Sequence, residues 1–165
     1  MKYSKINKFD VANGEGVRVS LFVSGCPHHC KGCFNSETWD YDYGEEFTKE
    51  VISSILAHCN PDFISGLTLL GGEPLAPANL KQTTLLSAMF KKFYKQKTLW
   101  CYTGYDWERI KHLPIMEFID ILVDGRFIEE QKDISLKFRG SRNQRIIDVQ
   151  ESVAKNQVIL WRGNK

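Results

Sequence analysis

The chain has 165 residues, 42% of them hydrophobic and 25% charged, which suits one globular domain with a hydrophobic core. A formal net charge of +2 gives no overall field that would attract nucleic acid or a membrane, and no run approaches the roughly 20 apolar residues of a membrane span. The N-terminus also lacks the apolar stretch of a secretory signal. We therefore expect a single cytoplasmic domain, residues 1–165, without nucleic-acid or membrane partners.

Four apolar runs rich in Val, Ile and Leu are typical of buried parallel strands. They lie at 17–23, 66–70, 98–102 and 118–123. After Asp124 the sequence becomes polar and irregular, and two more strands are expected there, at 144–149 and 157–161.

Helices are predicted between these strands, at 48–59, 79–96 and 106–113. In the first, apolar residues fall on one stripe at helical spacing, and Thr48 can cap its start. Strand alternating with helix predicts an α/β fold with right-handed crossovers. Four clear strands are too few for a closed eight-stranded barrel, so an open, partial β/α barrel is expected.

The residues with the most distinctive chemistry follow the predicted strands directly. Cys26 follows the first strand, Gly71 to Pro74 the second, Thr103 and Gly104 the third, and Asp124 the fourth. Ligands of such folds bind at the carboxyl ends of the strands. The sequence therefore predicts one site where these four strand ends meet.

Three cysteines crowd the segment SGCPHHCKGCFN, at Cys26, Cys30 and Cys33. The total of five is odd, and a reducing compartment keeps thiols free, so the pattern indicates a metal centre. A structural zinc ion needs four ligands. The fourth would come from His28, His29, His58, Cys59 or Cys101. A [4Fe-4S] cluster instead uses three thiolates for three irons and leaves the fourth iron open to an outside ligand.

The other cysteines and the two loop histidines receive no role from the sequence. Cys59 ends a predicted helix and Cys101 lies inside a predicted strand, so both are interpreted as inert buried thiols. His28 and His29 are interpreted as partly exposed loop side chains. Gly25 and Gly32 suit a loop that must turn tightly around a ligand.

The Cys-x-x-x-Cys-x-x-Cys spacing after a first strand resembles the radical S-adenosylmethionine superfamily. More narrowly, DVANGEGVRVSLFVSGCPHHCKGCFNSETWD, GGEP, YTGY, VDGRF and FRGSRNQRIIDV resemble the activating proteins of anaerobic ribonucleoside-triphosphate reductases. These segments extend from Asp10 to Val149. The resemblance implies the partial barrel of the radical S-adenosylmethionine type.

The resemblance also implies a site. Cys26, Cys30 and Cys33 would hold the [4Fe-4S] cluster, whose open iron binds the methionine part of S-adenosyl-L-methionine. Gly71 and Gly72 would offer backbone groups to the methionine ammonium and Glu73 would support that pocket, although Gly and Pro are also ordinary turn residues. Asn35 matches a position close to the cofactor; on its own it could cap a helix.

Two further groups of residues are assigned by resemblance. Thr103 and Asp124 resemble positions that line the adenosylmethionine and bind a monovalent cation in related activases, but the local sequence YTGY departs from that pattern. Arg139, Arg142 and Arg145 would dock the partner protein or cover the radical site; a solvated basic loop is the alternative.

The function implied by the resemblance is reductive cleavage of adenosylmethionine, followed by hydrogen abstraction from a glycine of the reductase large subunit. A flavodoxin-type protein would supply the electron. Two alternatives stay open at this stage: an activase of another glycyl radical enzyme, and a zinc-stabilised binding module without chemistry.

Overall fold

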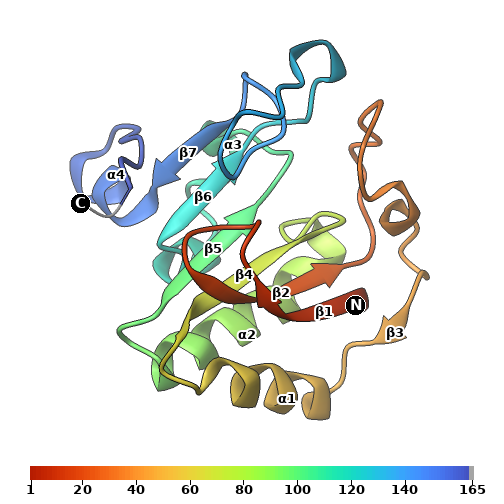
Figure 1. The fold of residues 1–165 in the computed structure, drawn as a ribbon, viewed down its shortest axis with the longest axis vertical. Helices are drawn as coiled ribbons and strands as arrows, with labels where there is room; N and C mark the ends of the chain where they lie inside the picture. Colours follow the sequence, from red (N-terminus) through yellow and green to blue (C-terminus); the bar gives the residue numbers. More distant parts are fainter. Residues whose placement is uncertain (164–165) are drawn as a thin grey trace.

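The computed structural model describes residues 1–163 and contains one seven-stranded mixed sheet flanked by helices (Figure 1). The strands follow the spatial order β3-β1-β2-β4-β5-β6-β7. Their bounds are β1 Lys2–Asp10, β2 Val17–Val23, β3 Glu45–Glu46, β4 Ile64–Gly71, β5 Thr98–Tyr102, β6 Ile121–Asp124 and β7 Arg145–Asp148.

The four predicted apolar strands are confirmed, and they form the parallel centre of the sheet. In the register, Val23 of β2 pairs with Gly71 of β4, and Tyr102 of β5 pairs with Val123 of β6. Their carboxyl ends therefore reach the same edge of the sheet. The outer strands β1, β3 and β7 pair antiparallel.

Two expectations at the C-terminal end need correction. The segment 144–149 is a strand only as far as Asp148, because Asp148 caps a helix that the sequence analysis did not predict, α4 Val149–Lys155. The strand expected at 157–161 is wrong, since this stretch makes one isolated bridge, between Leu160 and Ile147.

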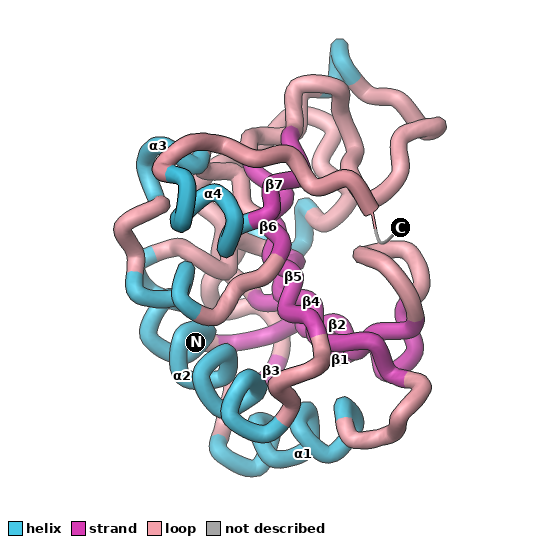
Figure 2. Tube along the Cα trace, turned by 90° about the vertical axis from the view of Figure 1, so that its left-hand side faces the viewer, coloured by secondary structure: helices cyan, strands magenta, loops and turns pink. Residues whose placement is uncertain are grey.

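The four α-helices found among residues 1–163 cover one face of the sheet (Figure 2). Besides α4 they are α1 Lys49–Cys59, α2 Pro77–Phe93 and α3 Trp107–Ile110, close to the predicted positions. The Thr48 hydroxyl caps α1 as predicted, by accepting a hydrogen bond from the N–H of Val51. Short 3-10 helices occur at Ser36–Trp39, Pro114–Glu117 and Glu129–Gln131.

Alternation along the strands separates the two faces of the sheet. Leu99 and Cys101 of β5 point into the core beneath the helices, whereas Trp100 packs on the opposite face, against Phe138 and Trp161. Loops rather than helices cover this second face. Within residues 1–163, no helix combines the length and the apolar character required to cross a membrane.

A buried arginine ties the loop 11–16 to the sheet. The Arg18 guanidinium donates to the hydroxyls of Thr68 and Thr98 at 2.7 and 2.9 Å, and to the carbonyl of Glu15 at 3.1 Å. Burial lowers the pKa of Arg18 to about 10, which still leaves the side chain charged at neutral pH. The Thr68 hydroxyl in turn donates to the carbonyl of Asn13, which fixes this loop beside the predicted site.

Candidate metal centre and cofactor pocket

A pocket of about 200 Å³ lies at the carboxyl ends of the four parallel strands. It is lined by Asn13 and by residues from four segments, 26–35, 70–73, 102–104 and 125–144. The structure thus brings together the strand ends that the sequence singled out. In Figure 1 the chain after β2 and the chain after β6 both extend from this edge of the sheet.

The loop after β2 carries all three clustered cysteines into this pocket. The N–H groups of Gly25 and Cys26 donate to the carbonyls of Thr38 and Trp39, at 2.8 and 3.1 Å. The chain turns back through Gly32, whose φ of 72° lies in the left-handed region that favours glycine. The result is a closed loop from Gly25 to Trp39 with free, half-buried thiols facing one cavity.

Burial changes the acid–base behaviour of these thiols. It raises the pKa of Cys26 to about 11, with a smaller contribution from the nearby Glu73 carboxylate, and it raises the pKa of Cys30 as well. The thiolate is the form that binds metal. Metal binding at this loop therefore has to release protons.

The donor set fits an iron–sulfur cluster better than a zinc ion. Among residues 1–163, no group of three or more His, Cys, Asp or Glu side chains is arranged around a single metal position. Cys59 and Cys101 are fully buried in the hydrophobic core. Of the two loop histidines, His28 is engaged with Glu73 at 2.8 Å and His29 stacks on Trp39. Three cysteines that bind three different irons do not need to converge on one point, and thiolates are the ligands such clusters use.

The turn after β4 brings main-chain groups close to the cysteine loop. Gly71 has a φ of 106°, and a Cβ there would lie 2.7 Å from the Cα of Phe22. The N–H groups of Gly72 and Glu73 donate to the carbonyls of Val23 and Gly25, at 2.7 and 2.8 Å. With these N–H groups engaged, carbonyl oxygens are the main-chain groups of the turn that are left to bind an ammonium group.

Glu73 is buried and accepts hydrogen bonds from three parts of the chain. Its Oε1 accepts from the Thr103 hydroxyl at 2.8 Å and from the N–H of Leu75 at 2.9 Å. Its Oε2 accepts from the N–H of Gly104 at 2.7 Å and lies 2.8 Å from Nε2 of His28. Thr103 thus lines the pocket but directs its hydroxyl to Glu73, and His28 acquires a partner that sequence reasoning missed.

Two asparagines contribute to the same region. Asn35 lines the pocket, and its carbonyl, rather than its side chain, bonds the following turn at Thr38. The helix cap considered from the sequence is therefore not formed by its side chain. Asn79 of α2 is a site-supporting residue that the sequence analysis missed: its amide donates to the carbonyls of Ser24 and Glu73 at 2.9 and 3.0 Å.

Asp124 and Arg145, assigned to different roles from the sequence, form one ion pair. The Asp124 carboxylate is buried and accepts from Nε and Nη2 of Arg145 and from the N–H of Trp107. Hydrogen bonds to Asp124, and then to Glu108, raise the pKa of Arg145. Asp124 does not line the pocket, although the next residue, Gly125, does.

Another wall of the pocket is formed by the segment 125–144, which we call the wall segment. It folds back on itself through a bridge between Lys132 and Ser141. The Gln144 side chain closes its base by bonding the N–H of Gly140 at 2.9 Å and the carbonyl of Gly125 at 3.1 Å. Arg139 donates to the carbonyl of Gln144, whereas the largely exposed Arg142 pairs with Asp133 near the tip.

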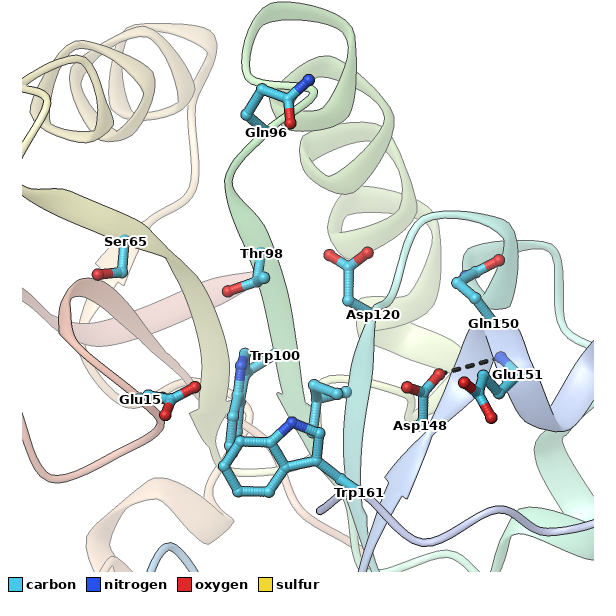
Figure 3. A pocket seen from close by; sticks show the side chains of 11 residues that line it. Glu15, Ser65, Gln96, Thr98, Trp100, Asp120, Asp148, Gln150, Glu151 and Trp161 are labelled. Carbon is cyan, nitrogen blue, oxygen red and sulfur yellow. Dashed lines mark hydrogen bonds between the residues drawn. The ribbon is translucent and has the colours of Figure 1, made fainter. Parts of the chain in front are cut away.

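A larger pocket, of about 560 Å³, lies at the opposite ends of the parallel strands, far from the cysteines (Figure 3). Trp100 and Trp161 line it together with several carboxylates. Three of these carboxylates already have partners, since Asp120 binds Lys91, Asp148 caps α4 and Glu151 pairs with Lys155. The cysteine pocket is therefore the better candidate for chemistry.

Comparison with known proteins agrees with this choice. A family model described as a 4Fe-4S single cluster domain matches residues 12–147, which include all three clustered cysteines, and it supports an iron–sulfur cluster in this chain. Curated relatives from Vibrio cholerae, Haemophilus influenzae and Escherichia coli are 42%, 40% and 38% identical over 148 residues, 87% of this chain and 96% of each relative. Each is named anaerobic ribonucleoside-triphosphate reductase-activating protein. The chain belongs to this family of activating proteins.

Proposed function

We propose that this protein cleaves S-adenosyl-L-methionine reductively at a [4Fe-4S] cluster and generates a glycyl radical on an anaerobic ribonucleoside-triphosphate reductase. The observation that carries the proposal is the meeting of three free, half-buried cysteines with the Gly71–Gly72 turn in one pocket. The family membership supports the same activity, because the relatives are named for activating that reductase.

Different residues of the pocket would bind the cluster and the cofactor. Cys26, Cys30 and Cys33 would hold three irons of the cluster, and the carbonyl oxygens near Gly71 and Gly72 would bind the ammonium of the methionine moiety. When bound, the cluster supplies one electron, which splits a sulfonium C–S bond to give methionine and a 5′-deoxyadenosyl radical. Asn35 is assigned to the cofactor by resemblance and lines the same pocket.

We further propose that the sheet is the partial barrel of the radical S-adenosylmethionine type. Four parallel strands with helices on one face and the candidate site at their carboxyl ends support this assignment. A flavodoxin-type protein is the electron donor that the family resemblance implies, and a chemical reductant can replace it in the tests below.

Electron paramagnetic resonance of the reconstituted protein tests the proposed function. We expect about four irons per chain and, after reduction, a cluster signal that changes when adenosylmethionine is added, because the cofactor binds the open iron. Addition of the reductase should then yield a glycyl radical signal. A cluster signal that is indifferent to adenosylmethionine, or stoichiometric zinc in place of iron, contradicts the proposal.

The wall segment provides a test of partner docking at Arg142. The side chain is 73% exposed, and it forms an ion pair with Asp133 near the tip of the segment. Because exposed rim charges act mainly on association, we expect Arg142→Ala to raise the reductase concentration for half-maximal radical yield about fivefold. Adenosylmethionine cleavage without the reductase should change less than about twofold.

Asp133→Ala is the matched control for Arg142→Ala, because it removes the same ion pair but keeps the arginine. We expect it to activate the reductase like the unmodified protein. Equal impairment in the two variants would mean that the ion pair shapes the segment. A parallel loss of cleavage and activation in Arg142→Ala would assign the arginine to the cofactor pocket or to the fold.

A further inference from the structure

The two adjacent histidines of the cysteine loop have different surroundings. The His28 side chain is 5% exposed and lies 2.8 Å from Oε2 of Glu73, whereas His29 is exposed and stacks on Trp39 with an interplanar angle of 8°. Of the two histidines, only His28 connects the cysteine loop to the turn after β4, in addition to the main-chain bond from Glu73 to Gly25. The Glu73 oxygens accept from each of their other partners, so Nε2 of His28 is assigned as the donor to Oε2.

The ring of His28 is enclosed by the chain that follows β5. It meets the edge of the Tyr105 ring at a centroid distance of 4.5 Å. A Cβ on Gly104 would lie 2.4 Å from Cδ2 of His28, so the absence of a side chain at this glycine makes room for the imidazole. The position of the ring is thus fixed by packing as well as by its hydrogen bond.

Glu73 joins three segments that are distant in the sequence. His28 belongs to the cysteine loop, Thr103 and Gly104 belong to the chain at the end of β5, and Glu73 itself belongs to the turn after β4. The Glu73 side chain is 1% exposed, and its one ion-pair contact among residues 1–163 is with His28. Removing one hydrogen-bond donor from a buried carboxylate costs free energy, so the bond to His28 holds the loop firmly against the turn.

We propose that His28 is a positioning residue that holds the loop of Cys26, Cys30 and Cys33 against the Gly71–Glu73 turn, through Glu73, and so sets the distance between the cluster and the bound adenosylmethionine. The part of this inference that concerns the cofactor rests on the proposed function. The contact between His28 and Glu73, which we call the clamp, does not depend on that function, because both groups belong to the protein. His28 touches no reacting atom in this scheme.

The same substitution at both histidines separates the clamp from general effects on the loop. Asn is too short to reach Glu73 from position 28, while at position 29 it tolerates the positive φ of 48°. His28→Gln is the rescue variant, because its longer amide can place an N–H near the position of the imidazole Nε2. All three variants keep the three cysteines.

Hydrogen exchange of the full-length chain before iron is added tests the clamp alone. We expect amides in 24–33 and 103–105 to exchange about tenfold faster in His28→Asn, and to stay near the unmodified rate in His29→Asn and His28→Gln. Equal rates in His28→Asn and the unmodified chain overturn the proposal, and so does equal acceleration at the two histidines. If His28→Asn does not fold, the test rests on His28→Gln. That variant must fold and show the exchange rates of the unmodified chain; otherwise the proposal is overturned.

Adenosylmethionine titration of the iron-loaded proteins, followed by electron paramagnetic resonance, tests the consequence for the cofactor. We expect His28→Asn to load iron normally but to bind adenosylmethionine about tenfold more weakly, with His28→Gln restored to within about threefold. If the unmodified protein does not bind adenosylmethionine, the proposed function fails and the exchange result still decides the clamp. If all variants bind it equally, the positioning role alone is overturned.

Discussion

Replacing Cys26, Cys30 or Cys33 with Ala is expected to abolish both the cluster and the production of 5′-deoxyadenosine. Each of these thiols lines the pocket, and the two other cysteines, Cys59 and Cys101, are buried in the hydrophobic core. Loss of one thiolate therefore leaves one iron without a protein ligand. Iron content, absorption near 400 nm and deoxyadenosine yield after reduction measure the effect.

Cys59→Ala and Cys101→Ala are the matched controls for this experiment. Both residues are fully buried in the hydrophobic core, on the helical side of the sheet. Their removal costs about 1 kcal/mol of the free energy of unfolding through lost apolar contact, and iron loading should remain intact. Equal loss of the cluster in all five variants would refute the assignment of the three loop cysteines.

Gly71→Ala is expected to lower the free energy of unfolding by about 3 kcal/mol and to prevent formation of the turn after β4. The residue has a φ of 106°, and the three atoms nearest to an added Cβ, at 2.7 to 2.8 Å, all belong to the main chain of Phe22 and Val23. Main-chain atoms of a central strand cannot rotate away as a flexible side chain can. Chemical denaturation of the full-length chain measures the loss.

Gly125→Ala separates the backbone strain at Gly71 from the steric clash. Gly125 has a similar φ of 92°, but the nearest atom to an added Cβ is 3.6 Å away. Strain without a clash should cost about 1 kcal/mol. If the two variants are destabilised equally, close packing between β2 and the turn is not the reason for glycine at position 71.

The centre of the sheet could be predicted from the sequence because burial on both faces produces continuous apolar runs. The strands at 17–23 and 98–102 agree with β2 and β5 residue for residue. The fourth strand begins at Ile121 rather than at 118, since Phe118 and Ile119 bond back to Ile115 and end the preceding 3-10 helix. Apolar character alone does not distinguish a strand from the turn that leads into it.

The edges of the sheet were harder to predict. In β1, Lys2–Asp10, lysines and asparagine interrupt the apolar residues, and most positions are partly or fully exposed. At the other edge, apolar residues continue from β7 into α4, so the run at 144–149 concealed the point where Asp148 starts a helix. Edge strands and short helices depend on pairing and capping contacts that a hydrophobic pattern does not contain.

The segments that form the site could be predicted from the sequence, but the hydrogen bonds and ion pairs between them could not. Strand ends of a parallel sheet meet at one edge, which is why the cysteines and the glycine turn could be placed together. From the sequence alone, neither His28 nor His29 can be singled out as the partner of Glu73. Which of them faces Glu73 depends on the left-handed backbone at His29. Likewise, 21 positions separate Asp124 from Arg145, and only the pairing of β6 with β7 joins them.

The pocket has two halves that are built differently. The cysteine loop, the glycine turn and the end of β5 are interlocked through a single carboxylate, whereas the wall segment closes on itself through Gln144. The two halves nevertheless touch, because Lys31 of the cysteine loop pairs with Glu129 of the wall segment and the ring of Phe34 lies beside that of Phe127. A substitution at Phe127 or Glu129 therefore acts on the metal-binding loop as well as on the wall, whereas the exposed tip around Arg142 can vary with the partner protein.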